Sequence, residues 1–472
     1  MQKLKTYIES LDEILHGGIP EFAVTVITGE PGSGKTVLTL QTMFNNARHG
    51  AKCIYFTTLS EPAPKLIRYT QMFEFFDEDL INNNFKFADL GSALREGGPD
   101  QAMERLIEVV EAEQPDIVAI DSFKAIHDLV PDTESARLFV YDLAVQLSLW
   151  SVTTFLVGEY TPEEISHSPE FAVADAIINM GTETSELASL REIQIKKLRG
   201  SSFNSGKHFF EIGSAGVRIY PRVGTALNIE SSTSGGRVSS GVPGLDELLH
   251  GGLPSQSATI IEGGTGIGKT LLGLHFMARG LSEGEKGIIF TFEETPDQLK
   301  AIAAHFGLSI GSGTDVEIQY TAPVELLGAK WLTLARDRVQ ELGAKRVMLD
   351  SVSTMAMGVT TERRFKDLIY TAVKMFRSMG VTFIMTMEAP ELLGSSMLTG
   401  HGISSMSDNI IMMRYVEVES QLKRAISILK MRGTSHENDL REFKITNEGI
   451  LIGEPFKHFQ GVLSGLPTPA AQ

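Results

Sequence analysis

Short apolar runs rich in β-branched residues alternate along this chain with stretches of helical periodicity. Residues 52–56, 152–157 and 381–386 are typical of buried strands, and residues 37–49 have the spacing of a helix. Buried strands separated by helices favour a parallel arrangement, because each crossover places a helix on a face of the sheet. We therefore expect an α/β protein with mostly parallel sheets flanked by helices.

The pattern is present twice. The segment SLDEILHGGIP at residues 10–20 returns as GLDELLHGGLP at residues 244–254, an offset of 234. A period this long indicates tandem domains and not a solenoid of short repeats. We predict a first domain over residues 1–227, a Ser/Gly-rich linker over 228–240 and a second domain over 241–472.

Each half contains the phosphate-binding loop G-x-x-x-x-G-K-[ST] between an apolar run and a helical stretch. The glycines let consecutive N–H groups curl round a phosphate, and the start of the helix adds partial positive charge. A glycine-rich turn would explain one such loop, but not two in register. ATP and Mg²⁺ are the cofactors that these loops imply. The predicted nucleotide-binding residues are Gly29, Gly32, Ser33, Gly34, Lys35 and Thr36, and Gly263, Thr265, Gly266, Ile267, Gly268, Lys269 and Thr270.

An acidic residue ends an apolar run in both halves. Asp121 and Asp350 close these runs in the Walker B pattern, which places a carboxylate at the carboxyl end of a strand, facing the Mg²⁺ site. Glu159 and Glu388 end a further pair of equivalent strands. The predicted Mg²⁺ ligands are Thr36 and Asp121 in the first half, and Thr270, Asp350 and Glu293 in the second.

Two adjacent carboxylates, Glu293 and Glu294, follow a predicted strand of the second half. Either can orient a water molecule or accept a hydroxyl proton. When residues 65–66 are aligned with 298–299, Ser60 replaces Glu293 and Glu61 matches Glu294. We predict Glu61, Glu293 and Glu294 as catalytic carboxylates, and expect the first domain to bind ATP but to hydrolyse it more slowly than the second.

A basic strand recurs at residues 191–200 and 424–433. Charge protects an edge strand from aggregation, so the pattern alone allows a purely structural interpretation. The functional interpretation is that these cations reach the γ-phosphate held by a neighbouring subunit. An arginine finger supplied in this way raises the rate about 10³–10⁵-fold, so catalysis would depend on assembly.

The composition limits the classes of partner. The 472 residues carry a formal net charge of −17 with no basic run of five or more, whereas nucleic-acid binding relies on Lys and Arg. The single cysteine, Cys53, excludes disulfides within the chain. The sequence shows no signal-peptide core and no apolar run near the length of a membrane span. We expect a cytoplasmic protein that binds neither nucleic acid nor membranes.

The doubled P-loop domains, the Glu293-Glu294 pair and three short segments together resemble the KaiC family of circadian-clock ATPases and autokinases. The segments are RVSSG at 237–241, KMRGTSH at 430–436 and REF at 441–443. The resemblance runs nearly end to end and is closer in the second half. It implies tandem RecA-like P-loop NTPase domains in a two-tiered homohexamer, with ATP between neighbouring subunits. It also implies that Arg424 is the catalytic finger and that the neighbour's nucleotide is contacted by Lys197, Arg199, Lys430 and Arg432.

The same resemblance implies autophosphorylation of two adjacent hydroxyl residues in the second domain. Aligned back from Asp408, these fall on Ser404 and Ser405, and the first domain has Phe171 and Ala172 instead. A serine-rich loop is the structural alternative. The chain ends at Gln472, before the tail that binds the activator KaiA in the family, which argues against KaiA-type activation. A KaiB-like partner is compatible with the resemblance but is not located by the sequence.

Two other function classes share the same fold. A RecA/RadA-like recombination ATPase would need basic DNA-facing loops, which the net charge disfavours. A non-catalytic scaffold would use ATP only to assemble the ring. Substituting Glu293 and Glu294 by Gln separates the scaffold from the enzyme, because only the enzyme loses turnover.

Overall fold

The computed structural model describes residues 2–59, 62–130, 132–185, 188–222, 235–311, 315–359, 361–389, 402–418, 420–456, 459–460 and 468–469. The chain divides into two compact units, Met1–Arg222 and Val223–Gln472, and each is described by itself. Residues 228–234 of the predicted linker lie outside the described residues, and the predicted domain limits stay a prediction.

The first unit begins with short elements and then alternates strands with helices. Its helices are α1 (Glu9–Ile14), α2 (Lys35–Arg48), α3 (Ala63–Thr70), η1 (Glu78–Leu80, 3₁₀), α4 (Gly91–Glu113), α5 (Phe123–His127), α6 (Thr133–Leu149), α7 (Pro162–His167) and α8 (Pro169–Val173). Its strands are β1 (Lys3–Leu4), β2 (Ile19–Pro20), β3 (Val24–Gly29), β4 (Cys53–Thr57), β5 (Phe85–Asp89), β6 (Ile117–Asp121), β7 (Thr153–Gly158), β8 (Ala176–Ser185), β9 (Ala188–Leu198), β10 (Lys207–Gly213) and β11 (Gly216–Tyr220).

The second unit repeats this order. Its helices are α9 (Pro243–Leu248), α10 (Lys269–Ser282), α11 (Pro296–His305), η2 (Pro323–Glu325, 3₁₀), α12 (Gly328–Leu342), α13 (Val352–Met357) and α14 (Glu362–Ser378). Its strands are β12 (Arg237–Val238), β13 (Leu253–Pro254), β14 (Ala258–Gly263), β15 (Gly287–Thr291), β16 (Val316–Tyr320), β17 (Arg346–Asp350), β18 (Thr382–Glu388), β19 (Asn409–Val418), β20 (Gln421–Met431), β21 (Arg441–Thr446), β22 (Gly449–Pro455), β23 (Phe459–Gln460) and β24 (Thr468–Pro469).

The central sheets of the two units have the same topology. In the first the strand order is β5-β4-β6-β7-β3-β8-β9-β10-β11, and in the second it is β16-β15-β17-β18-β14-β19-β20-β21-β22. The six strands from β5 to β8 pair in parallel, and β9, β10 and β11 extend the sheet by antiparallel pairing. The predicted mostly parallel sheets are therefore confirmed. The strands predicted at 52–56, 152–157 and 381–386 shift by one or two residues at their ends, and the basic strands predicted at 191–200 and 424–433 begin three residues earlier.

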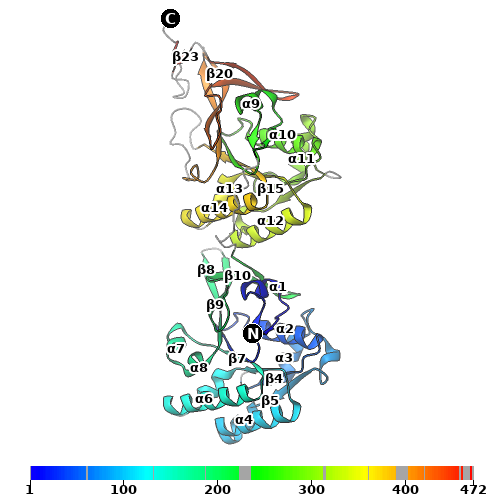
Figure 1. Ribbon diagram of the computed structural model, residues 1–472, viewed down its shortest axis with the longest axis vertical. Helices are drawn as coiled ribbons and strands as arrows, with labels where there is room; N and C mark the ends of the chain where they lie inside the picture. The colour runs from blue at the N-terminus through cyan, green and yellow to red at the C-terminus, as the bar shows by residue number, and fades with distance from the viewer. Residues whose placement is uncertain are drawn as a thin grey trace. The chain divides into compact units, whose positions relative to one another are not determined.

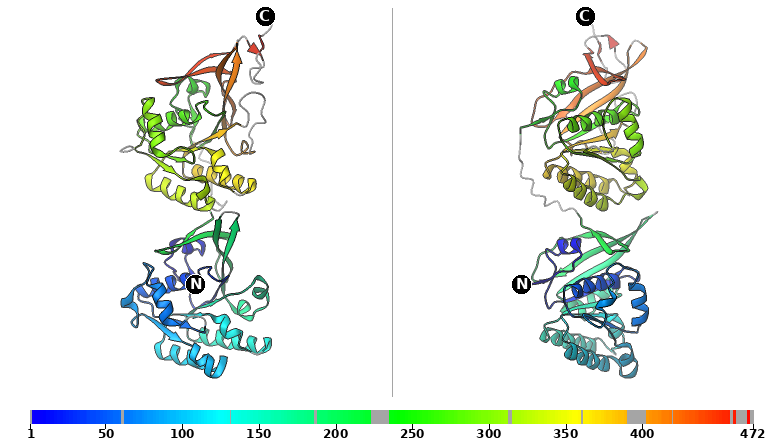
Figure 2. Two further views of the ribbon diagram at one scale, coloured as in Figure 1. Left: turned by 180° about the vertical axis from the view of Figure 1, so that it is seen from behind. Right: turned by 90° about the vertical axis from the view of Figure 1, so that its right-hand side faces the viewer.

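The central parallel strands of each sheet are buried on both faces, as their continuous apolar sequences predict. On β6, Val118 and Ile120 pack with residues of α4, α5 and α6, whereas Ile117 and Ala119 pack with residues of α2. The same alternation recurs on β17 of the second unit. Figures 1 and 2 show the helices on the two faces of each sheet. Among the described residues, no helix combines the length and the apolar character needed to cross a membrane.

Candidate nucleotide-binding sites

The second P-loop connects β14 to α10. Its last glycine, Gly268, lies immediately before the helix with a φ of 115°, and Gly266 has a φ of 70°, so both adopt the left-handed backbone that glycine allows. A Cβ on Gly263 would lie 2.5 Å from the carbonyl oxygen of Met413 on β19. Lys269 turns back over the loop, and its Nζ donates to the carbonyl oxygens of Gly263 and Gly264, each at 2.9 Å.

The first P-loop has the same construction between β3 and α2. A Cβ on Gly29 would lie 1.8 Å from the carbonyl oxygen of Met180, so side chains are excluded at the same place. Lys35 donates to the carbonyl oxygens of Gly29 at 3.1 Å and Glu30 at 2.8 Å. The two predicted loops therefore share one backbone geometry.

Carboxylates surround both P-loop lysines. Burial lowers the pKa of Lys269, and the nearby charges of Glu388 and Asp350 oppose this shift. Burial likewise lowers the pKa of Lys35, opposed first by Glu159, whose carboxylate lies 3.7 Å from Nζ. Glu159 and Glu388, which end equivalent strands, thus lie beside the loops, and Glu388 also hydrogen-bonds Thr265.

The Walker B aspartates lie beside the P-loop threonines. Thr36 Oγ1 donates to Asp121 Oδ2 at 2.7 Å. In the second unit burial raises the pKa of Asp350, and hydrogen bonds from Thr386 and Thr270 oppose that rise. One oxygen of Asp350, Oδ2, is buried without a hydrogen-bond partner in the part of the chain that the structure describes. A buried anionic oxygen of this kind is a fitting ligand for a hard cation such as Mg²⁺.

Glu293 and Glu294 follow β15, which pairs directly with the Walker B strand β17. Burial raises the pKa of Glu294 to about 7, and the charges of Asp350 and Glu293 act in the same direction. Glu293 is exposed and accepts a hydrogen bond from Thr354 at 3.3 Å. Of the two predicted carboxylates, Glu294 is thus the one whose pKa is held near neutral pH by its surroundings.

The corresponding connection of the first unit is one residue longer. Thr58 and Phe292 occupy matching positions, because their N–H groups donate to the carbonyl oxygens of Asp121 and Asp350. The next helix begins at Ala63 in the first unit and at Pro296 in the second. Glu61 lies outside the described residues. Its predicted catalytic role, and the slower hydrolysis expected of the first domain, stay predictions.

The basic strands are β9 and β20, next to the last parallel strand of each sheet. Lys430 Nζ donates to the carbonyl oxygens of Ser404 at 2.8 Å and Ser407 at 2.7 Å, and Arg432 donates to that of Ser405 at 3.1 Å. In the first unit the matching contacts run from Lys197 and Arg199 to the segment before β8. Within one chain these cations therefore hold the turn that carries the predicted phosphorylation sites, or its counterpart.

Ser404 is half-buried and Ser405 is exposed in that turn, whereas Phe171 at the first matching position is buried. The guanidinium of Arg424 lies 5.5 Å from the ring centre of Tyr415, and its Nε is buried without a hydrogen-bond partner among the described residues. The predicted role of Arg424 toward a neighbour stays a prediction.

Tyr55 and Thr386 also contact the Walker B aspartates, and motif analysis missed both. Tyr55 OH donates to Asp121 Oδ2 at 2.5 Å, and Thr386 Oγ1 donates to Asp350 Oδ1. Aligning the two halves could have found them, because Ile289 replaces Tyr55 and Val157 replaces Thr386.

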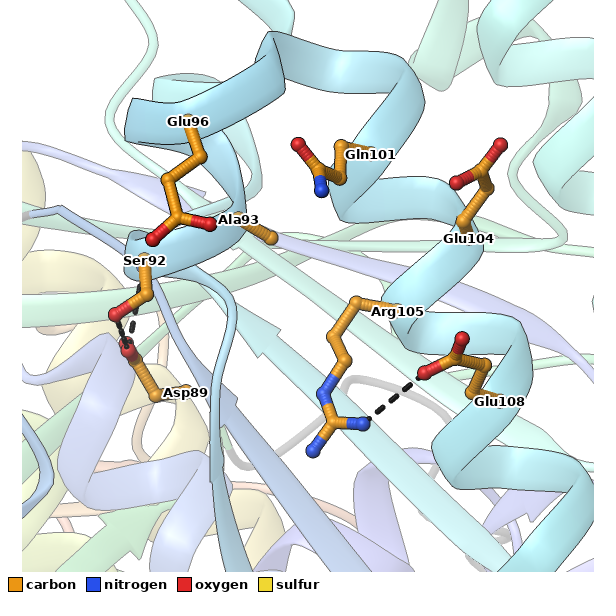
Figure 3. Close-up of a pocket in the computed structure, with 8 residues that line it drawn as sticks. All are labelled: Asp89, Ser92, Ala93, Glu96, Gln101, Glu104, Arg105 and Glu108. Carbon is orange, nitrogen blue, oxygen red and sulfur yellow. Dashed lines mark hydrogen bonds and ion pairs between the residues drawn. The ribbon is translucent and has the colours of Figure 1, made fainter.

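A hollow beside α4 of the first unit is a separate feature. Figure 3 shows its acidic lining, in which Arg105 pairs with Glu108 at 3.1 Å and Ser92 donates to Asp89 at 2.6 Å. No residue of the predicted nucleotide sites lines it. It therefore does not belong to the nucleotide-binding machinery.

Two mostly parallel sheets, each with a P-loop and a Walker B aspartate at the carboxyl ends of its strands, define tandem RecA-like P-loop NTPase domains. The chain belongs to the KaiC ATPase family: the family model described as "ATPase: KaiC" matches residues 4–224, 238–320 and 329–457. The sequence resemblance is thereby confirmed.

Curated relatives agree over the full length. The circadian clock oscillator protein KaiC of Picosynechococcus sp. is 29% identical, covering 100% of this chain and 93% of its own. The protein of the same name from Rippkaea orientalis is 30% identical, covering 99% of this chain and 92% of its own. The circadian clock protein KaiC3 of Synechocystis sp. is 30% identical, covering 100% and 96%.

Proposed function

We propose that both units bind ATP with Mg²⁺ and that this ATPase acts as a ring with autokinase activity in its second unit. The observation that carries the proposal is the convergence of the P-loop lysine, the Walker B aspartate and the P-loop threonine at one sheet edge in each unit. Mg²⁺, when bound, neutralises charge on the phosphate oxygens. Thr36, Asp121, Thr270 and Asp350 would hold it, with Glu293 beside the second site.

Glu294 is the preferred general base for hydrolysis in the second unit. A base works best when its pKa lies near the working pH, and the pKa of Glu294 is raised to about 7. Its carboxylate orients and deprotonates the attacking water, while Lys269 holds the β- and γ-phosphates. Glu293 adds negative charge that raises the proton affinity of Glu294.

Phosphate release measured on P-loop variants tests which unit turns over. We expect Lys269→Ala to remove most of the activity and Lys35→Ala to remove less, because the first unit lacks a second adjacent glutamate. Equal losses would contradict this division of labour. Glu294→Gln should abolish turnover of the second unit while nucleotide binding remains, and unchanged turnover would favour the non-catalytic scaffold.

The autokinase part rests on the turn at 404–406. The exposed Ser405 hydroxyl and the half-buried Ser404 hydroxyl lie on a turn held by Lys430 and Arg432. Mass spectrometry after incubation with Mg·ATP should find phosphate on Ser404 or Ser405, and none after Lys269→Ala. Protein that carries no phosphate at either residue would remove the kinase assignment.

The ring is proposed because Arg424 has no ion-pair partner among the described residues of its own chain. A half-buried cation without an ion-pair partner fits an anionic group supplied from outside its own chain, such as a neighbour's phosphate. Size-exclusion chromatography with light scattering should show a hexamer when Mg·ATP is present. A monomer under those conditions would contradict the ring. A KaiB-like partner, the absence of KaiA-type activation and a cytoplasmic location stay predictions.

A further inference from the structure

The two Walker B aspartates receive their extra hydroxyl from opposite neighbouring strands. In the first unit the donor is Tyr55 on β4, and in the second it is Thr386 on β18. Each unit has an apolar residue where the other has its hydroxyl donor. On β7 of the first unit, Val157 lies opposite Asp121, at the position that Thr386 occupies on β18 of the second unit. On the other side, Ile289 of β15 takes the place of Tyr55.

The two hydroxyls reach different oxygens of their carboxylates. Tyr55 OH at 2.5 Å and Thr36 Oγ1 at 2.7 Å both donate to Oδ2 of Asp121. Thr386 donates to Oδ1 of Asp350, and Oδ2 is the buried oxygen without a hydrogen-bond partner among the described residues. Tyr55 thus shares the oxygen that faces the P-loop threonine, whereas Thr386 leaves one oxygen of its aspartate for the cation.

Tyr55 has little freedom to move its hydroxyl away. Its side chain is 0% exposed and lies in the core between the sheet and α2. Its ring centre lies 5.8 Å from that of Phe87. Each carboxylate oxygen has two lone-pair directions, and two donors on one oxygen fill both. A cation or its bound water must then displace a hydrogen bond from Oδ2 of Asp121, whereas Oδ2 of Asp350 has no such bond among the described residues.

We infer that Tyr55 and Thr386 are positioning residues that set the Mg²⁺ requirement of the two clefts in opposite directions. Tyr55 weakens Mg²⁺-dependent nucleotide binding in the first cleft by occupying the oxygen of Asp121 that faces Thr36. Thr386 strengthens it in the second by orienting Asp350 from the other oxygen. This inference rests on the proposed binding of Mg·ATP by both units.

The test measures Mg²⁺ titrations of the binding of ATP that carries a fluorescent ribose label. The Lys269→Ala protein reports the first cleft and the Lys35→Ala protein reports the second. Tyr55→Phe, which removes one hydroxyl, should lower the Mg²⁺ midpoint of the first cleft about threefold or more. Thr386→Val should raise the midpoint of the second cleft about tenfold. The matched controls are Tyr55→Phe in the Lys35→Ala protein and Thr386→Val in the Lys269→Ala protein, and both should leave the Mg²⁺ midpoint unchanged.

A second variant guards against misfolding of Tyr55→Phe. Val157→Thr adds to Asp121 the hydroxyl that Asp350 has, and it should also lower the midpoint of the first cleft. Direct titration of Mn²⁺ by electron paramagnetic resonance should give the same order of affinities. An unmoved or raised midpoint for Tyr55→Phe, or an unmoved midpoint for Thr386→Val, would overturn the inference. Loss of all Mg²⁺-dependent binding in both single-cleft proteins would instead contradict the proposed function itself.

Discussion

Gln41 and His275 occupy matching positions on α2 and α10, and each accepts a backbone hydrogen bond from the last strand of its sheet. Val217 N–H donates to Gln41 Oε1 at 2.7 Å, and Ile450 N–H donates to His275 Nε2 at 3.4 Å. Both side chains are buried. His275 can accept this hydrogen bond, as Gln41 does, only while Nε2 is unprotonated. This contact of the second unit therefore responds to pH, whereas the matching contact of Gln41 does not.

The sign of that pH response follows from burial. Burial lowers the pKa of His275 below its usual value of 6.5, so the folded chain binds a proton less readily than the unfolded chain. The stability from this group is complete above about pH 6.5 and is lost as the pH falls through the folded pKa. We predict that His275→Gln, copying the first unit, flattens the fall in unfolding temperature between about pH 7 and pH 5. Thermal unfolding profiles of wild type and variant that stay parallel over this range would contradict it.

Among the elements, Arg346 ties the start of the second unit to its sheet. This residue begins β17, is 1% exposed, and replaces Ile117 of β6. Its guanidinium donates to the carbonyl oxygens of Ser239 at 2.8 Å and Phe276 at 2.9 Å. It also pairs with Glu283 at 2.7 Å and Glu285 at 2.5 Å.

Removing this charge should destabilise the second unit. Arg346→Met leaves two carboxylates and two carbonyls without their donor, and we expect the free energy of unfolding to fall by about 3 kcal/mol. The lower end of the usual range applies because both glutamates are about one-third exposed. Arg338→Met, which removes surface pairs with Glu317 and Glu341, is the control and should change stability little. Denaturant unfolding measures both, and equal effects of the two substitutions would contradict the account.

The end of β20 holds the turn at 404–407 through Lys430. This side chain donates to two carbonyl oxygens of the turn, at 2.8 and 2.7 Å. Lys430→Met keeps the length of the side chain but removes both bonds, so hydrogen exchange of the amides at 403–408 should speed up about tenfold or more. The matched Lys197→Met change in the first unit should leave those amides unaffected. Unchanged exchange after Lys430→Met would show that the turn does not depend on this lysine.

The parts of the candidate sites that the sequence could predict are those encoded by contiguous motifs. The P-loops and the Walker B aspartates are short patterns whose backbone requirements are local, so Lys35, Lys269, Asp121 and Asp350 could be placed in advance. Contacts that cross strands could not, because Tyr55 and Asp121 are brought together only by the register of β4 and β6. The raised pKa of Glu294 likewise depends on burial that no single motif encodes.

At the scale of the whole molecule, the two units share a sheet topology but differ in the groups around the phosphates. The first has Tyr55 beside its Walker B aspartate, whereas the second has Thr386 there and Glu293 where the first has Ser60 in the sequence. Duplication followed by such exchanges gives the two clefts of one chain different side chains near the Mg²⁺ site. The family match extends across both units, so the difference lies within a KaiC-type ATPase and not between unrelated domains.

Each cleft is expected to hydrolyse ATP only with cations from a neighbouring copy, and rings that mix two variants give the sharpest test of this dependence. In a Lys35→Ala background, which silences the first cleft, one copy carries Lys269→Ala and the other Arg424→Ala. Each alone should be inactive, because one lacks the cleft and the other lacks the finger. When both are co-expressed, roughly a quarter of the interfaces join an intact cleft to an intact arginine, so about a quarter of the parent's ATP hydrolysis should return. Rings of the two copies that stay as inactive as either copy alone would contradict the account.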